Sequence, residues 1–235
     1  MNNKHHIIKR LVLFFIGMSI IQLGVALYLK TNIGSDPFTI FTQGLAFTLN
    51  KTGIKNLDII SSSGVTPGVA NMIISIALLC IIFFIERKRI NIGTLICVIG
   101  VGPIIDLGVK AVSYFPVESY NLVIRAFLVL LGCLIIAIGF SILSATNLGV
   151  APNDIVPFLI QDKTKFQYRW IRMSMDAVLL ILGFILGGVV GIGTIISMLA
   201  TGPFIQFCLP YGEKVVNMII GYEKENIDVE TTVQV

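Results

Sequence analysis

Residues 31–37 read TNIGSDP, and residues 146–152 read TNLGVAP. Both stretches follow a long apolar run and fit one pattern, TNxGxxP. Asn and Gly tolerate the left-handed backbone that ends a helix, and Pro suits the first turn of the next helix. Each stretch therefore predicts a break at which a long helix ends and a second helix starts at the proline.

The similarity between the two halves of the chain extends beyond these breaks. Residues 17–37 align with 132–152, and residues 92–106 align with 192–206. The matched identities include Gly17 and Gly132, Gly24 and Gly139, Ile92-Gly93-Thr94 and Ile192-Gly193-Thr194, and Gly102-Pro103 and Gly202-Pro203. Compositional bias would match isoleucines, but it would not repeat these glycine and proline motifs in the same order. We therefore predict two homologous repeats.

The composition places these repeats in a membrane. The chain has 235 residues, of which 55% are hydrophobic and only 13% are charged, and its mean hydropathy is +0.91. A soluble domain carries about 25% charged residues, so a soluble globular, disordered or disulfide-stapled protein is excluded. Runs without charge cover 11–29, 59–85, 126–153 and 177–212. Each run can hold a span of about 20 residues, and only helices or closed barrels satisfy the backbone in lipid.

The runs are too long and continuous for the alternation of a barrel, so we expect an all-α polytopic membrane protein. The expected spanning helices cover about 9–30, 67–85 and 90–112 in the first repeat and about 121–144, 169–188 and 192–211 in the second. Two shorter and more polar segments follow the breaks, at 37–49 and 152–162.

Whether these two short segments cross the bilayer decides the topology. If they crossed, the basic turn at 86–89 would face outside, against the tendency of Lys and Arg to stay in the cytoplasm. If they are re-entrant or interfacial, this turn and both termini fall inside. Each repeat then has three spans, so the second is inverted relative to the first (3+3), a plan known from secondary transporters. We favour this arrangement and keep crossing segments as the alternative.

The resulting organisation has five parts, in a multi-pass protein of the plasma membrane. They are a cytoplasmic N-terminus at 1–10, a first repeat at 11–112, an external linker at 113–121, a second repeat at 122–212 and a polar, cytoplasmic C-terminal tail at 213–235.

These motifs resemble those of the YitT-like/YczE-like family of bacterial integral membrane proteins. The resemblance covers about residues 10–210 and is carried by Gly17, Gly24, Asn32-Ile33-Gly34-Ser35-Asp36-Pro37, Ile92-Gly93-Thr94 and Gly102-Pro103-Ile104-Ile105-Asp106. It implies a bacterial plasma-membrane protein of about six helices, without a settled activity. The acidic residue that the family places soon after the proline is Asp154 in the second copy, but the first copy has Thr39. A symmetric acidic pair is therefore in question.

Polar residues at the breaks and inside apolar segments are candidates for binding a solute or ion. They are Asn32, Asp36, Gln43, Asp106, Asn147, Asn153, Asp154 and Gln206. A carboxylate at the membrane centre costs about 2.5–3.5 kcal/mol, so Asp106 suits a proton or cation site, or alternatively a hydrated pair with Lys110 at i+4. Asp36 is more typical of a helix N-cap. Asp154, two positions after Pro152, favours a role in a site.

Other charged residues and glycines have simpler interpretations. Arg172 and Asp176 have i,i+4 spacing and are predicted to form an interfacial pair that reaches toward water, and Arg125 is interpreted similarly. Gly183 and Gly187 have GxxxG spacing, and Gly17 and Gly24, like Gly132 and Gly139, are seven residues apart on one helix face. Both patterns allow close approach of helices. We assign these glycines to packing and not to chemistry.

No catalytic motif points to an enzyme. Walker A, HExxH, GxSxG and GxGxxG patterns are absent, and the four cysteines lack ligand spacing. We therefore expect no catalytic residue, cofactor or metal. The net charge of +4 comes from basic clusters beside spans, so nucleic acid is not an expected partner. The expected partners are the lipid bilayer, a small polar solute or ion, and either a second copy or another membrane protein.

Three functions fit this pattern. The first is a transporter or permease for a small polar or ionic solute, favoured by inverted repeats with polar short helices. The second is a membrane-embedded binding subunit of a multi-component importer. The third is a non-transporting accessory or scaffold protein of the membrane.

Overall fold

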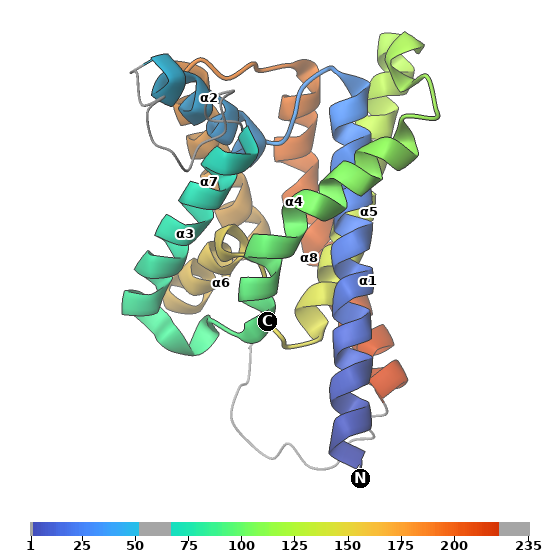
Figure 1. The fold of residues 1–235 in the computed structure, drawn as a ribbon, viewed down its shortest axis with the longest axis vertical. Helices are drawn as coiled ribbons and strands as arrows, with labels where there is room; N and C mark the ends of the chain where they lie inside the picture. The colour runs from blue at the N-terminus through green and yellow to red at the C-terminus, as the bar shows by residue number, and fades with distance from the viewer. Residues whose placement is uncertain (1, 52–66, 221–235) are drawn as a thin grey trace.

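The structure, a computed structural model, describes residues 2–51 and 67–220, apart from the side chains of residues 2–5, 67–72, 102, 103 and 106. This part of the chain is helical and contains no strand (Figure 1). Its α-helices are α1 (Asn2–Thr31), α2 (Pro37–Lys51), α3 (Pro67–Glu86), α4 (Ile92–Val112), α5 (Leu122–Ala145), α6 (Pro152–Thr164), α7 (Tyr168–Ile185) and α8 (Ile192–Ile220). Two short 3-10 turns, η2 (Arg87–Arg89) and η3 (Val117–Ser119), connect α3 to α4 and α4 to α5.

The helix boundaries follow the expectation closely at the two breaks. The short helices α2 and α6 begin at Pro37 and Pro152, as the TNxGxxP pattern predicts. Three boundaries differ from the prediction. The first helix, α1, begins at Asn2 and not near residue 9. The helix α7 stops at Ile185 and not at residue 188, because Gly187 has a left-handed φ of 92° that ends the helix. Gly187 therefore does not act as a GxxxG packing residue within a helix.

The last helix is also longer than the predicted 192–211. It continues to Ile220, because its final turns pack against the start of α1. Leu13, Val216 and Ile220 form a buried apolar cluster, and the ammonium group of Lys9 donates a hydrogen bond to the carbonyl oxygen of Ile219 at 3.0 Å. These contacts stabilise the helical conformation of residues 213–220, which the sequence analysis assigns to the polar C-terminal tail.

The helices form two groups, and each group takes two helices from each half of the chain (Figure 1). One group contains α1, α4, α5 and α8, with α1 packed on α5 and α5 on α8. The other contains α2, α3, α6 and α7. The contacts of α7 with α8, α3 with α4 and α2 with α8 join the two groups. The two halves are thus interleaved and do not form separate domains.

Glycines allow α1 and α5 to pack closely against each other. A Cβ atom on Gly17 would lie 2.9 Å from the carbonyl oxygen of Gly139, and one on Gly24 would lie 2.8 Å from that of Gly132. The contacts run in opposite sequence directions, so the two helices are antiparallel. The packing role predicted for these glycines is confirmed. Gly183 has the same role between α7 and α2, since its Cβ would lie 2.7 Å from the backbone nitrogen of Phe41.

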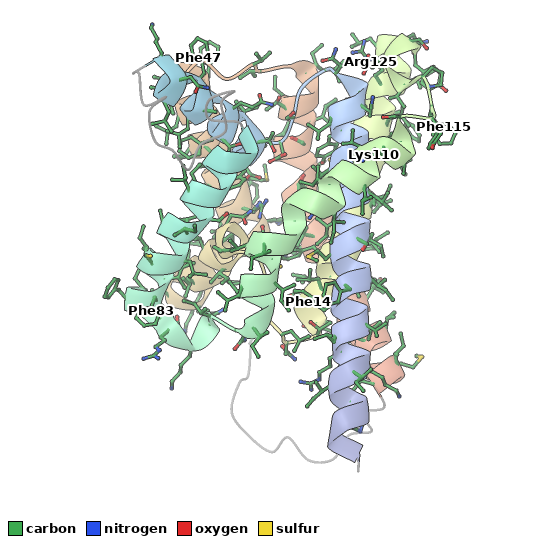
Figure 2. The ribbon with its side chains drawn as sticks, viewed as in Figure 1. Phe14, Phe47, Phe83, Lys110, Phe115 and Arg125 are labelled. Atoms are coloured by element: carbon green, nitrogen blue, oxygen red, sulfur yellow. The ribbon has the colours of Figure 1, made fainter. Side chains whose placement is uncertain are left out.

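The outer surface suits lipid. Among the described residues, three segments are long and apolar enough to cross a membrane: His6–Thr31, Leu122–Ala145 and Ile192–Ile220. Phe47, Phe83 and Phe115 point outward in Figure 2, and their exposed fractions are 59%, 44% and 65%. Monomeric soluble proteins rarely expose apolar surface so widely. The protein is therefore a helical membrane protein.

The order of the helices in space places the connections at two ends of the molecule. The start of α1, η2 and the end of α8 lie toward the lower end in Figure 1, whereas η3 lies at the upper end. The short helix α2 lies in the upper half of this view, and α6 lies in the lower half.

The α1–α5 contact yields a prediction about stability. We expect Gly139→Ala to lower the free energy of unfolding by about 1–3 kcal/mol, because the new Cβ would lie 2.7 Å from the backbone nitrogen of Ile21. Gly100→Ala is the matched control, since its Cβ would meet only the flexible end of Met18 within 3.2 Å. Thermal unfolding of both purified variants in detergent measures the difference. Equal losses in the two variants would contradict the assigned contact.

Candidate functional site

The two breaks share an unusual backbone conformation. Asn32 and Asn147 have positive φ angles of 50° and 57°, and Gly34 and Gly149 have φ angles of 133° and 116°. The left-handed residues end α1 and α5, as the sequence predicts. The side chains of Asn32 and Asn147 are exposed, and neither lines the pocket described below.

Each break packs against the other half of the chain. The amide of Gly193 donates a hydrogen bond to the carbonyl oxygen of Ile33 at 2.9 Å, and the amide of Gly93 donates one to Leu148 at 2.9 Å. The first break therefore contacts the Ile-Gly-Thr motif that starts α8, and the second contacts the Ile-Gly-Thr motif that starts α4. The two motifs that recur in the sequence are partners in the structure, crosswise between the halves.

The glycines of the breaks allow this approach. A Cβ atom on Gly34 would lie 2.6 Å from the Oγ1 atom of Thr194, and one on Gly149 would lie 2.7 Å from that of Thr94. Both threonines are fully buried. A side chain at either glycine would push the break away from the helix start on which it rests.

One charged residue, Arg125, binds the backbone of the first break. Arg125 donates hydrogen bonds from Nε to the carbonyl oxygen of Thr31 at 2.6 Å and from Nη2 to that of Asn32 at 2.9 Å; Figure 2 places it beside the end of α1. A cation is favourable at the C-terminal end of a helix. Arg125 therefore binds the last carbonyls of α1, and its position at the membrane interface stays a prediction.

Asp36 is the N-cap of α2. Its carboxylate accepts hydrogen bonds from the backbone nitrogen of Thr39 at 3.0 Å and from the Thr39 hydroxyl at 2.6 Å. These contacts confirm the capping interpretation. Thr39, which occupies the position of the acidic Asp154 in the second copy, therefore takes part in the N-cap of α2.

An ion cluster of Asp154, Arg172 and Asp176 lies between α6 and α7. The Nη1 atom of Arg172 is 2.6 Å from Oδ1 of Asp154, and its Nε atom is 3.4 Å from Oδ2 of Asp176. The three side chains are only 14%, 18% and 6% exposed for Arg172, Asp154 and Asp176 respectively. The predicted i,i+4 pair exists, but the expectation that it reaches toward water is wrong. The packing of α6 on α7 buries Arg172 against Asp154.

A pocket of about 140 Å³ borders this cluster. It lies between the two short helices, α2 and α6, and the helices that follow them in the chain, α3 and α7. Asn153, Arg172 and Asp176 are its polar residues, and the apolar ones are Phe38, Phe41, Ile74, Leu78, Val156, Met175 and Leu179. The structure therefore brings together, in one pocket, side chains from both halves of the chain.

The sequence-predicted candidates divide between this site and structural roles. Asn153 lines the pocket, and its amide donates to Asp154 at 3.3 Å. Gln206 instead accepts a hydrogen bond from the backbone of Arg169 at 3.3 Å, which supports the start of α7. Gln43 is half-buried on α2 and is not among the pocket residues.

Asp106 lies in α4, but its side chain is outside the described residues. Both interpretations of it, an ion site and a pair with Lys110, stay predictions. Within 2–51 and 67–220, the described side chains include no group of three His, Cys, Asp or Glu that could hold a metal ion.

Sequence reasoning missed Arg172 and Asp176 as site residues. Their i,i+4 spacing explains both charges as a pair within one helix. For this reason the sequence alone did not indicate that Arg172 also binds Asp154 on α6. One available signal was the position of Asp176, directly before the apolar stretch 177–185 that forms the rest of α7. An acidic residue followed directly by such a run is expensive in a membrane unless it faces a cavity or a partner.

A family model described as a family of unknown function, DUF6198, matches residues 8–210. The chain belongs to this DUF6198 family. The resemblance to YczE-like proteins is confirmed, since the DUF6198 protein is similar to an uncharacterized membrane protein, YczE, of Bacillus subtilis (strain 168). The two are 24% identical over 218 residues, which cover 92% of this chain and 93% of the relative.

Two further relatives of the DUF6198 protein have comparable similarity. An uncharacterized protein of Haemophilus influenzae is 27% identical over 86% of this chain and 84% of its own length. The uncharacterized protein YyaS of Bacillus subtilis (strain 168) is 26% identical over 85% of this chain and 92% of its own length. No solved structure matches the DUF6198 protein significantly. One of the three relatives is named a membrane protein, and none of the three names states an activity.

The ion cluster yields a second prediction about stability. We expect Asp154→Asn to destabilise the fold by about 3 kcal/mol, because it leaves the buried Arg172 without its nearest partner. Asp162→Asn removes a carboxylate of the same helix whose side chain is 56% exposed, and it should cost less than about 1 kcal/mol.

Chemical unfolding in detergent compares these variants with the double variant Asp154→Asn/Arg172→Gln. The double variant should lose less than the sum of the two single losses, because each single substitution already removes the 2.6 Å contact between Arg172 and Asp154. Additive losses from Asp154→Asn and Arg172→Gln would show that the two side chains do not interact.

Proposed function

We propose that this protein is a transporter or permease that moves a small polar or ionic solute across the cell membrane. The observation that carries the proposal is the pocket between α2, α3, α6 and α7, which the buried charged residues Arg172 and Asp176 line. Charged side chains inside a membrane protein are costly, and those that persist commonly mark the route of a solute or ion.

We further propose that the two halves are inverted repeats. The antiparallel glycine contacts of α1 with α5 support this relation, because Gly17 meets Gly139 and Gly24 meets Gly132. A two-fold axis that exchanges the halves would convert one contact into the other. The crosswise hydrogen bonds from Gly193 to Ile33 and from Gly93 to Leu148 are exchanged by the same axis.

Inverted repeats supply a mechanism for transport. Two related halves of opposite orientation can adopt each other's conformation, so that a site between them opens first to one side and then to the other. The short helices α2 and α6 contribute Phe38, Phe41, Asn153 and Val156 to the pocket. A relative movement of α2 and α3 against α6 and α7 would therefore change access to the pocket without rearranging the ion cluster within α6 and α7.

The proposed orientation places both termini, η2 and the end of α6 in the cytoplasm. The basic residues Arg87, Lys88 and Arg89 support it, since positive charge favours the cytoplasmic side. The linker at 113–121 and the end of α2 then face outside, in the plasma membrane of a bacterial cell.

Cysteine labelling tests this orientation. In a background with Cys80, Cys97, Cys133 and Cys208 replaced by Ala, single cysteines are introduced as Lys51→Cys, Lys88→Cys, Ser119→Cys and Thr164→Cys, all at exposed positions. A membrane-impermeant thiol reagent on intact cells should label positions 51 and 119 and spare 88 and 164. Labelling of 51 and 164 from the same side would overturn the inverted arrangement.

Flux measurements test the transport function itself. The purified full-length protein is reconstituted in liposomes, and uptake of a panel of small radiolabelled cations, anions and neutral solutes is compared with protein-free liposomes. We expect saturable uptake of at least one solute. Asp154→Asn should reduce this uptake strongly, because it releases Arg172 into the pocket, whereas Asp162→Asn should not. No uptake of any solute, together with co-purification of a second membrane protein, would favour the importer-subunit or accessory function instead.

A further inference from the structure

The carboxylates near the pocket are stabilised to different degrees. Asp36 caps α2, and Asp154 lies in the first turn of α6, so the positive end of a helix dipole compensates part of each negative charge. Asp176 lies in the middle of α7 and receives no such help. It is also the most buried of the three members of the ion cluster, with a side chain that is 6% exposed.

Arg172 compensates Asp154 better than Asp176. Its distance of 2.6 Å to Asp154 is that of a strong charge-assisted hydrogen bond, whereas its 3.4 Å contact with Asp176 is long. One guanidinium and two carboxylates leave a net charge of −1 on the ion cluster. The unbalanced negative charge therefore resides mainly on Asp176, and Asp176 lines the pocket while Asp154 does not.

A second buried polar group lies beside the cluster. Tyr168 is only 2% exposed, and its hydroxyl lies within reach of Arg172. The single guanidinium of Arg172 therefore serves Tyr168 as well as Asp154 and Asp176. This sharing leaves the charge of Asp176 incompletely compensated.

We propose that the pocket binds a small organic cation, whose positive group pairs with Asp176 and whose apolar body packs against Phe38 and Phe41. A monovalent cation brings the ion cluster to neutrality. The two phenyl rings offer apolar surface to the body of the ligand, and an aromatic face also attracts a cation. This inference rests on the proposed function, because it assigns a solute class to the same pocket.

The dimensions of the pocket limit the ligand. A cavity of about 150 Å³ accommodates benzene, so a pocket of about 140 Å³ suits a ligand with about six non-hydrogen atoms. Inorganic cations fit less well, since hard cations take several oxygen ligands and only Asn153 and Asp176 bring side-chain oxygens to the pocket. An anion fits less well again, because the near face of Arg172 is already occupied by carboxylates.

Three probes of equal size separate charge from shape: piperidinium, cyclopentanol and butyrate. Their dissociation constants for the full-length protein in lipid nanodiscs are measured by ligand-observed NMR. We expect piperidinium to bind at least about tenfold more tightly than the other two, as one charge-assisted hydrogen bond requires. Equal binding of the three probes, or preference for butyrate, overturns the proposal with no need for a variant.

Matched variants locate the site. Asp176→Asn should weaken piperidinium binding about tenfold, whereas Asp162→Asn, which lies outside the pocket, should leave it within about twofold. Asp154→Asn should also weaken binding, because Arg172 is then free to neutralise Asp176. Equal effects of Asp176→Asn and Asp162→Asn overturn the assignment. If Asp176→Asn fails to fold, the comparison of the three probes on the unmodified protein decides.

Flux of the same three probes in liposomes distinguishes this inference from the proposed function. Selective binding of piperidinium without any flux keeps the cation site and overturns the transporter. Saturable flux of butyrate or cyclopentanol, without selective piperidinium binding, keeps the transporter and overturns the cation site.

Discussion

The crosswise hydrogen bonds at the two breaks hold the architecture together. Inside a bilayer, every backbone N–H and C=O group needs a partner within the protein, and a break between helices leaves several of them free. Ile33 and Leu148 supply carbonyl oxygens at the breaks, and Gly193 and Gly93 supply amides near the starts of α8 and α4. Each break thus satisfies a free donor of the opposite half, and neither half can satisfy both groups alone.

This constraint positions the functional helices. The breaks are hydrogen-bonded to the starts of α4 and α8. The positions at which α2 and α6 begin, after the ends of α1 and α5, are therefore fixed. These two helices then pack with α3 and α7 and enclose the pocket. Gly44 and Gly183 allow α2 to lie directly against α7, since a Cβ on Gly44 would lie 2.6 Å from the carbonyl oxygen of Gly183. The scaffold is thus rigid where the backbones touch, and the pocket lies beside that contact.

Local patterns in the sequence predicted the local features of this structure. The breaks, the helix starts at Pro37 and Pro152, the cap by Asp36 and the glycine contacts all depend on residues within a few turns or on small side chains, which leave a clear signal. The partners of Arg125 and Gln206, and the partner Asp154 of Arg172, could not be predicted in the same way. Each lies on a different helix, and a single sequence carries no information on which helix faces which.

The proposed alignment of the halves also shows where their symmetry ends. The positions that match Asp154, Arg172 and Asp176 in the first half hold Thr39, Met72 and Ile76. The breaks and their glycines occur in both halves, because the backbone of each half needs the same hydrogen bonds. The ion cluster occurs in one half alone, because a duplicate would bury two more carboxylates with no structural benefit. The repeated residues therefore build the scaffold, and the unpaired ones supply its chemistry.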